Sequence, residues 1–285
     1  MPGRGRRPAI RATRQPGRDT PGAEPSTAFR WLLSVFRPLA APWVEVEGAE
    51  FLHEVPDPAL FVLNHNNTFE CAVVPPVLMG LRQGRPIHFL VDWAVLQVPI
   101  TGWLIRASGP IPVYTKRARF GFWEERRAEG RGHSPIAAAL ERLAAGSSVG
   151  LFPEGTRNGR SDALLRPRKG LGRLVLRSQV PVVPIGIRFR QGRQGRVARI
   201  GRARLRVGRP LTFAEERRLV AGSGPESALE RDLASRVARE VMAELARLST
   251  KTEFLPRTIA PNRPMPGAEP SFSKEELPCA ETRSP

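Results

Sequence analysis

The sequence predicts an α/β fold, a single domain in which helices flank a mostly parallel central sheet. Short apolar runs that indicate buried strands alternate along the chain with segments of helical spacing, the order typical of parallel sheets. Hydrophobic residues make up 41% of the 285 residues, which is enough to bury a core. We expect one domain over residues 28–250, between a disordered basic tail at 1–27 and a disordered tail at 251–285 that contains prolines and scattered charges.

Four elements are predicted before residue 100. Residues 28–43 carry apolar groups at helical spacing, so this helix either packs on the domain or lies in a membrane interface, where Trp and Arg are favoured. Ala59–Leu63 and Ile87–Val91 are short apolar runs that predict strands. Cys71–Leu81 is apolar enough for a helix, but two consecutive prolines leave its shape open.

The second half of the chain predicts further strands and helices. Ser134 is a good N-cap and Pro135 a good first helical residue, so a helix follows and ends at Gly146. Apolar residues from Leu229 to Leu245 recur every four positions and predict an amphipathic helix. The remaining elements are the strands Val149–Phe152, Val180–Ile187 and Ala203–Val207 and the helix Leu171–Arg177.

The net charge of +18 is concentrated in one part of the chain. From Arg157 to Arg209 there are 16 basic residues and a single acid, Asp162, although an Arg-rich codon bias accounts for part of this excess. Such a block indicates an anionic partner: nucleic acid, an anionic membrane or a phosphorylated substrate. Nucleic-acid surfaces interleave basic with aromatic groups, and Phe189 is the only aromatic residue in the block, so we expect no nucleic-acid partner.

Composition excludes several classes of protein. Two distant cysteines, Cys71 and Cys279, do not make a disulfide framework, and the four histidines lack metal-ligand spacing. No apolar run reaches the roughly 18 residues that span a bilayer, and the N-terminus lacks the form of a secretory signal peptide. We therefore expect no metal site and no transmembrane helix, in a protein that is cytosolic or peripheral to a membrane.

Polar loops follow two of the predicted strands. Asn64–Thr68 comes directly after the strand that ends at Leu63, and Pro153–Arg157 follows the strand that ends at Phe152. In open α/β sheets, ligands bind beyond the carboxyl ends of the strands. The two loops are therefore candidates for one site.

His65 and Glu70 are candidates for acid–base chemistry. The imidazole of His65 suits proton transfer near neutral pH. In a continuous helix, five residues turn about 500°, so the two side chains meet only if His65 lies in the loop and Glu70 in the first helical turn. A carboxylate there would fix the imidazole tautomer. The alternative is a surface histidine beside a capping carboxylate.

The second loop suits the binding of an anion. Gly155 allows a ligand to approach the backbone closely, and Arg157 can hold a phosphate in a bidentate grip. The alternative is a turn with a purely structural role.

Four blocks together resemble a known family. They are Asn64–Glu70, similar to an N-H-x4-D block with Glu as the acid; Gly109–Arg117, similar to G-x-I-x-x-x-R with the basic position shifted; Phe152–Arg157, which matches F-P-E-G-T-R; and Val180–Pro184, which matches V-P-x-x-P. Over roughly residues 60–210, the chain resembles the glycerolipid acyltransferases typified by 1-acylglycerol-3-phosphate acyltransferase.

The resemblance implies transfer of a fatty acyl group from acyl-CoA or acyl-carrier protein to the hydroxyl of a lysophospholipid such as 1-acylglycerol-3-phosphate. It implies direct transfer without a cofactor, with His65 as general base and Glu70 as the group that orients it. The substrate-binding residues that we expect are Asn64, Lys116, Arg117, Glu154, Gly155, Thr156, Arg157, Lys169 and Pro184. A peripheral location on the cytoplasmic face of an anionic membrane is also implied.

Two departures from the family pattern keep alternatives open. The extra methylene of Glu70 moves its carboxylate about 1.5 Å further out than an aspartate would place it. This favours, as alternatives, a transacylating or an inactive relative. The shifted basic position in the second block leaves open an acceptor without phosphate. A basic nucleic-acid-binding protein is the alternative from a different class.

Overall fold

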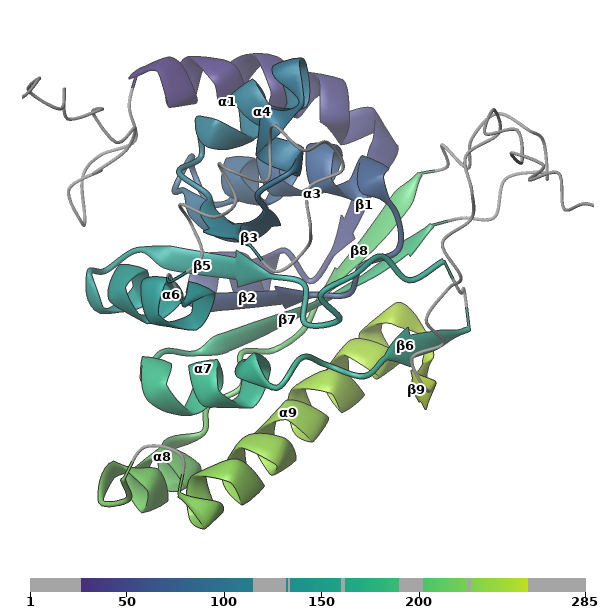
Figure 1. Ribbon diagram of the computed structural model, residues 1–285. Coiled ribbons are helices and arrows are strands. Elements are labelled where there is room, and N and C mark those ends of the chain that lie inside the picture. Colours follow the sequence, from purple (N-terminus) through teal and green to yellow (C-terminus); the bar gives the residue numbers. More distant parts are fainter. Residues whose placement is uncertain are drawn as a thin grey trace, which may run out of the picture. The chain divides into compact units, whose positions relative to one another are not determined.

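The structure is a computed structural model, and it describes residues 27–114, 132, 134–159, 162–189, 202–224 and 227–255. Within these ranges the main sheet has seven strands in the order β1-β8-β7-β2-β5-β3-β4 (Figure 1). Its strands are β1 (Val44–Glu47), β2 (Leu60–Leu63), β3 (Ile87–Asp92), β4 (Ile111–Val113), β5 (Ser148–Leu151), β7 (Val182–Phe189) and β8 (Ala203–Val207).

Five neighbouring strands of this sheet, from β7 to β4, run parallel to one another. β8 pairs with β7 in the antiparallel sense, and β1 is parallel to β8. The prediction of a mostly parallel sheet is therefore confirmed. Because β2 and β5 are adjacent and parallel, the loops that follow them leave the same edge of the sheet.

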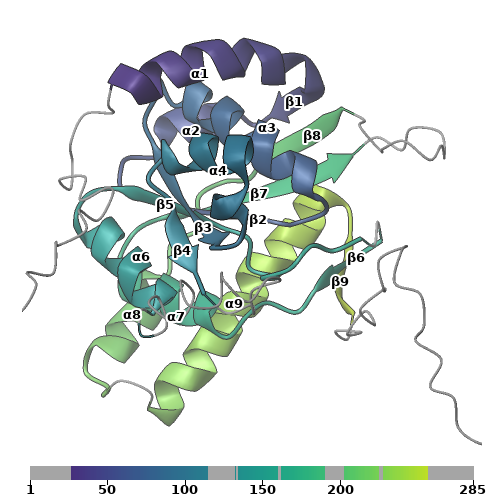
Figure 2. The same cartoon turned by 45° about the horizontal axis from the view of Figure 1, so that its top comes forward.

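Helices cover both faces of the sheet (Figures 1 and 2). The helices and 3₁₀ turns are α1 (Thr27–Ala40), η1 (Ala41–Trp43), α2 (Glu50–Glu54), α3 (Thr68–Leu81), η2 (Val95–Gln97), α4 (Pro99–Arg106), α6 (Pro135–Ala144), α7 (Gly170–Ser178), α8 (Ala214–Ala221) and α9 (Ala228–Ser249). One hydrophobic core lies between the sheet and α1 to α3, and a second lies between the sheet and α6 to α9.

Strand β2 shows why the central strands are apolar at every position. Leu60 and Val62 point into the core beneath α6 to α9, whereas Phe61 and Leu63 point into the core beneath α1 to α3. All four side chains are completely buried. A strand covered on both faces has no solvent side, so its sequence does not alternate between apolar and polar residues.

The segment Cys71–Leu81, whose shape the two prolines left undecided, is part of helix α3. The helix runs without interruption from Thr68 to Leu81, through Pro75 and Pro76. Its start is fixed by Asn67, whose side-chain oxygen accepts a hydrogen bond from the backbone N–H of Glu70 at 3.2 Å. The predicted helices over 28–43, 136–145 and 171–177 and from Leu229 to Leu245 are also present.

The prediction of a disordered tail from residue 251 onward is wrong for its first residues. Residues 252–255 form a strand, β9 (Thr252–Leu255), which pairs in parallel with β6 (Ala163–Leu165) in a second, two-stranded sheet. The backbone N–H of Thr252 donates to the carbonyl of Asp162 at 2.7 Å. Backbone hydrogen bonds thus hold a segment that composition alone gave no reason to expect in a sheet. Residues 1–26 and 256–285 lie outside the described ranges.

Candidate active site

The two polar loops lie together at the carboxyl edge of the sheet, as predicted. The backbone N–H of His65 donates to Oε1 of Glu154 at 2.9 Å. The backbone N–H of Asn158 donates in return to the carbonyl of His65 at 2.8 Å. The loop after β2 and the loop after β5 therefore form one continuous structure.

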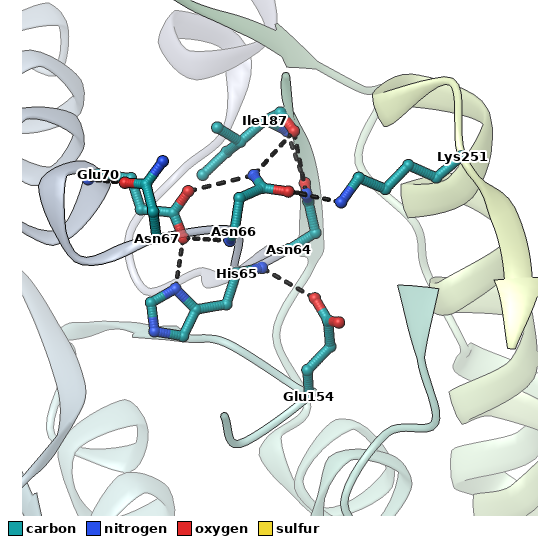
Figure 3. Close-up of polar contacts among 8 residues, drawn as sticks. All are labelled: Asn64, His65, Asn66, Asn67, Glu70, Glu154, Ile187 and Lys251. Atoms are coloured by element: carbon teal, nitrogen blue, oxygen red, sulfur yellow. Dashed lines mark hydrogen bonds and ion pairs between the residues drawn. The ribbon is translucent and has the colours of Figure 1, made fainter. Parts of the chain in front are cut away.

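His65 and Glu70 form a hydrogen-bonded pair (Figure 3). His65 lies in the loop and Glu70 in the first turn of α3, the one arrangement in which this spacing allows contact. Nδ1 of the imidazole contacts Oε1 of the carboxylate. Because a carboxylate only accepts hydrogen bonds, Nδ1 carries the proton, and Nε2 of the neutral ring is left with its lone pair.

The imidazole is held from its flat side as well as from its edge. The ring of Phe152 stacks on that of His65 with 4.5 Å between the ring centroids. The His65 side chain is 14% exposed, whereas Glu70 is fully buried. The ring therefore keeps limited access to solvent while its orientation is fixed.

Asn66 supplies two more donors to Glu70. Its backbone N–H donates to Oε1 at 2.6 Å, and its side-chain Nδ2 donates to Oε2 at 3.2 Å. The longer acid thus reaches His65 with both of its oxygens satisfied. The extra methylene of Glu70 does not prevent the contact that an aspartate makes in the family pattern.

Asn64, predicted to bind substrate, is completely buried and bound to the backbone of a neighbouring strand. Its Nδ2 donates to the carbonyl of Ile187 at 3.0 Å, and its Oδ1 accepts from the N–H of Ile187 at 2.6 Å. Both ends of the amide are therefore occupied by β7. Asn64 joins the loop to the sheet and has no face towards a ligand.

Glu154 is likewise buried and bound to backbone groups. Oε1 accepts from the N–H of His65, and Oε2 accepts from the N–H of Leu165 at 2.9 Å. Burial raises the pKa of Glu154, while these two N–H donors and the charge of Lys251 act in the opposite direction. This placement differs from the predicted contact with a head group: Glu154 ties the His65 loop to β6.

The other residues of the second loop do face a cavity. Gly155, Thr156 and Arg157 line it together with His65. Gly155 has a left-handed φ of +64°, and a Cβ there would come within 2.6 Å of the Arg168 guanidinium group, so glycine is required. The loop therefore presents a backbone turn, a hydroxyl and a guanidinium group beside the imidazole.

Four remaining predictions have different outcomes. Lys169 is exposed at the start of α7, and its neighbour Arg168 lines the cavity instead. Pro184 is buried in β7 on the side of α9, next to Gly208, so its ring does not shape the cavity as predicted. Lys116 and Arg117 lie outside the described residues.

The cavity has a volume of about 550 Å³ and is mainly apolar. Its apolar wall comes from α1, α3, α4, α6 and β3 and includes Phe29, Phe36, Met79, Phe89, Val91, Ile105 and Ile136. The imidazole of His65 and the loop with Arg157 make up its polar part. A ligand with an apolar chain and an anionic head would match both parts.

A family model matches the part of the chain that forms both loops of this site. The model of the family described as Acyltransferase matches residues 43–188, just over half of the chain. The chain belongs to the Acyltransferase family. The matched span holds both loops and the strands β2 and β5 that carry them.

Curated relatives of this chain include two plant proteins. Chloroplastic 1-acyl-sn-glycerol-3-phosphate acyltransferases of Brassica napus and Arabidopsis thaliana are each 27% identical to it over 143 residues, or 50% of this chain. The match spans only 36% and 35% of their own lengths, about one third of each relative.

A solved structure is also similar. The 1-acyl-sn-glycerophosphate acyltransferase PlsC from Thermotoga maritima is 20% identical, with a TM-score of 0.46. The match covers 77% of this chain and 82% of that one.

The described ranges contain neither a membrane-spanning helix nor a cluster of metal ligands. No helix there combines the length and apolar character needed to cross a membrane. In the same ranges, no three His, Cys, Asp or Glu side chains come together in a way that would hold a metal ion.

Cys71 directly follows Glu70 in the sequence, and its side chain also lines the cavity. Burial raises the pKa of its thiol to about 12, and the neighbouring charge of Glu70 acts in the same direction. The thiolate is the nucleophilic form of cysteine. At neutral pH Cys71 is therefore a protonated, weakly reactive wall residue.

Three residues of the candidate site had no predicted role. Asn66 holds Glu70, Asn158 bonds the carbonyl of His65, and Lys251 bonds Asn66 from the far end of the chain. Asn66 and Asn158 lie in or beside the motif blocks, so their positions could have drawn attention. Lys251 follows an amphipathic helix with no motif around it, and only the fold reveals its position.

Proposed function

We propose that the protein is an O-acyltransferase that moves a fatty acyl group from an acyl thioester to the hydroxyl of a lysophospholipid. The observation that carries the proposal is the His65–Glu70 pair in the wall of an apolar cavity. The pair supplies a base, and the cavity supplies room for an acyl chain. Family membership and the names of the two plant relatives support acyl transfer to a glycerophospholipid.

In the proposed reaction, Nε2 of His65 takes the proton of the acceptor hydroxyl as the hydroxyl oxygen attacks the thioester carbon. The new C–O bond forms, the C–S bond breaks, and the departing sulfur takes the proton back from the imidazolium. Glu70 keeps the other proton on Nδ1 and stabilises the imidazolium. This direct transfer needs no cofactor and no acyl-enzyme, in keeping with the raised pKa of the Cys71 thiol.

The acceptor that we favour is 1-acylglycerol-3-phosphate. Gly155, Thr156 and Arg157 would bind its polar head, because a guanidinium group can grip a phosphate with two parallel hydrogen bonds. Arg168 lies against Gly155, also lines the cavity and would add a second cation. Further phosphate contacts from residues 116 and 117 remain part of the proposal.

Acyl-CoA and acyl-carrier protein are both candidate donors. Each presents the acyl group as a thioester, so the chemistry at His65 is the same for both. The two donors differ in what surrounds the thioester, a nucleotide in one and a protein in the other. Only an assay with each donor separates them.

We also propose that the protein acts on the cytoplasmic face of a membrane, bound peripherally to anionic lipid. Trp31 and Leu39 of α1 are each 63% exposed, and Trp103 of α4 is 59% exposed. Arg30 and Arg37 accompany them on α1. Tryptophan and arginine are favoured together at a membrane interface. Both helices also contribute to the cavity wall, where a lipid substrate would enter.

The test offers the purified protein a panel of lysolipids, with and without a phosphate, each combined with acyl-CoA or acyl-carrier protein. We expect transfer to 1-acylglycerol-3-phosphate, and we expect His65→Ala to lower kcat by about 10²- to 10⁴-fold. His53→Ala, at an exposed histidine of α2, is the matched control and should keep the rate. Full activity in His65→Ala would contradict the assignment of the base, and activity only with phosphate-free acceptors would contradict the proposed head group.

A further inference from the structure

A buried lysine stands behind the His65–Glu70 pair. Nζ of Lys251 donates to Oδ1 of Asn66 at 2.5 Å, across 185 residues of sequence. Figure 3 shows Lys251 and Glu70 on opposite sides of Asn66. Lys251 is only 8% exposed, and it lies outside the span that the family model matches.

The backbone around Lys251 is held in place. Helix α9 crosses β7 so closely that a Cβ on Gly186 would come within 2.4 Å of the backbone carbon of Leu248. The helix ends one residue later, Thr250 adopts a left-handed φ of 53°, and the N–H of Lys251 donates to the carbonyl of Ala246 at 3.0 Å. β9 then pairs with β6, so the backbone is fixed on both sides of the lysine.

Burial of an ammonium group is unfavourable unless opposite charges or acceptors surround it. Burial lowers the pKa of Lys251, and the charges of Glu154, Glu70 and Asp162 act in the opposite direction. The lysine thus lies among the carboxylates of the site. If Lys251 only balanced the charge of these carboxylates, it would need no specific hydrogen-bond partner. Its hydrogen bond to Asn66 therefore indicates a further role.

That hydrogen bond, together with a longer one at 3.3 Å from Nδ2 of Asn64, holds Oδ1 of Asn66 on the side of Lys251. An ammonium group only donates, so it requires Oδ1 of Asn66 on its own side. The NH₂ group must then face away, where it donates to Oε2 of Glu70 at 3.2 Å and to the carbonyl of Ile187 at 3.1 Å. The reversed amide would direct its oxygen at a carboxylate and a carbonyl, both of which only accept.

We propose that Lys251 is a positioning residue: acting through Asn66, it holds the carboxylate of Glu70 against Nδ1 of His65. The proposal rests on the acyl transfer proposed above, in which that contact fixes the base. Glutamate has one more rotatable bond than aspartate, so its carboxylate has more freedom to lose. Asn66 donates twice to this carboxylate, and Lys251 makes the shorter, charged one of the two hydrogen bonds that hold the oxygen end of the amide responsible for the second.

Lys251→Met tests the proposal in the full-length protein, because it keeps the unbranched stem and removes the ammonium group. At saturating acyl donor we expect kcat to fall about tenfold, the loss of roughly one charge-assisted hydrogen bond, with KM for the lysolipid within about twofold of the original. Arg247→Met is the matched control. Arg247 is an exposed basic residue at the same end of α9, paired with Glu244, and its loss should leave kcat unchanged.

A double-mutant cycle separates positioning from general stability. Glu70→Gln removes the carboxylate through which Lys251 acts, so adding Lys251→Met in that background should change kcat by less than about twofold. An equal fall of kcat in both backgrounds would show that the lysine acts elsewhere and would overturn the proposal. An original kcat in Lys251→Met alone would overturn it as well.

The tautomer of His65 gives a readout that does not depend on turnover. In protein labelled with ¹⁵N-histidine, we expect His65 to carry its proton on Nδ1 and Lys251→Met to produce a mixture of tautomers. An unchanged tautomer would contradict the proposal even if the melting temperature fell. If Lys251→Met does not fold, Asn66→Ala tests the same link and should give the same loss and the same mixture. Absence of acyl transfer in the original protein would contradict the proposed function, and the tautomer would still test the role of Lys251.

Discussion

Glu70 makes use of the whole length of its side chain. Its Oε1 contacts Nδ1 of His65 and accepts from the backbone N–H of Asn66, and Oε2 accepts from the Asn66 amide. An aspartate on the same backbone would withdraw both oxygens by about 1.5 Å. The family's usual acid is therefore the poorer choice in this chain, because the surrounding donors are placed for the longer one.

We predict that Glu70→Asp lowers kcat about tenfold, although it restores the acid of the family pattern. The reason is the weakened charge-assisted hydrogen bond to His65, worth about 1.4 kcal/mol. Steady-state kinetics with a lysophospholipid acceptor measure the effect. Glu215→Asp, at an exposed position of α8, provides the control. A rate equal to or above the original would mean that the helix start can shift to reseat the shorter acid.

At the scale of elements, strands buried on both faces were predictable and edge strands were not. β2, β5 and β7 appear in the sequence as continuous apolar runs because both of their faces are covered. β1 alternates valine with glutamate over four residues, and its acids pair with Arg204 and Arg206 of β8. Such a strand is specified by its neighbour, and a pattern of four residues does not reveal it. β9 also has four residues, and β4 and β6 have only three each.

The contacts of the candidate site can likewise be divided into those that the sequence predicts and those that it does not. The contacts of His65 with Glu70 and Glu154 come from motif blocks and from adjacent parallel strands, so sequence and topology together predict that the loops meet. Lys251 reaches the site because α9 crosses β7 at Gly186, and nothing near residue 251 encodes that crossing. The roles of Asn64 and Glu154 were not predictable either, because burial decides whether a polar group faces ligand or backbone.

The close packing of α9 on β7 at Gly186 gives a testable prediction about stability. We expect Gly186→Ala to lower the free energy of unfolding by about 1–3 kcal/mol, because the added methyl would overlap the backbone of Leu248 and Ser249. Urea unfolding followed by circular dichroism measures the change. Gly222→Ala is the control, since a Cβ there has no neighbour among the described residues within 4 Å, and its effect should stay within about 0.5 kcal/mol. Equal stability of both variants would show that α9 can move away from β7 at little cost.

At the scale of the whole molecule, the basic residues between Arg157 and Arg209 do not form a single surface. Arg157 faces the cavity, Arg177 forms two hydrogen bonds with the buried Glu230, and Arg204 and Arg206 pair with the acids of β1. Arg204 and Arg206 of β8 are only partly exposed, at 34% and 35%, and their charges are balanced by these acids. The residues at 193–199 lie outside the described ranges.

The exposed tryptophans give the prediction for membrane binding. We expect Trp31→Ala and Trp103→Ala each to weaken binding to vesicles of anionic phospholipid roughly tenfold, because each removes a large amphipathic ring from the proposed interface. Vesicle sedimentation measures the partition. Leu219→Ala is the control, since Leu219 is 58% exposed on α8, on the opposite face of the sheet. Unchanged partition in both tryptophan variants would place the membrane contact elsewhere.

The link between Asn66 and Lys251 also sets an order of events during synthesis. The two residues lie 185 positions apart, so a ribosome makes the base and its carboxylate long before the cation behind them. A nascent chain that has emerged only as far as β7 would hold the whole family motif without the lysine. Because α9 must emerge and dock before Lys251 can bond Asn66, assembly of the site is completed only after the segment matched by the family motif has been synthesised.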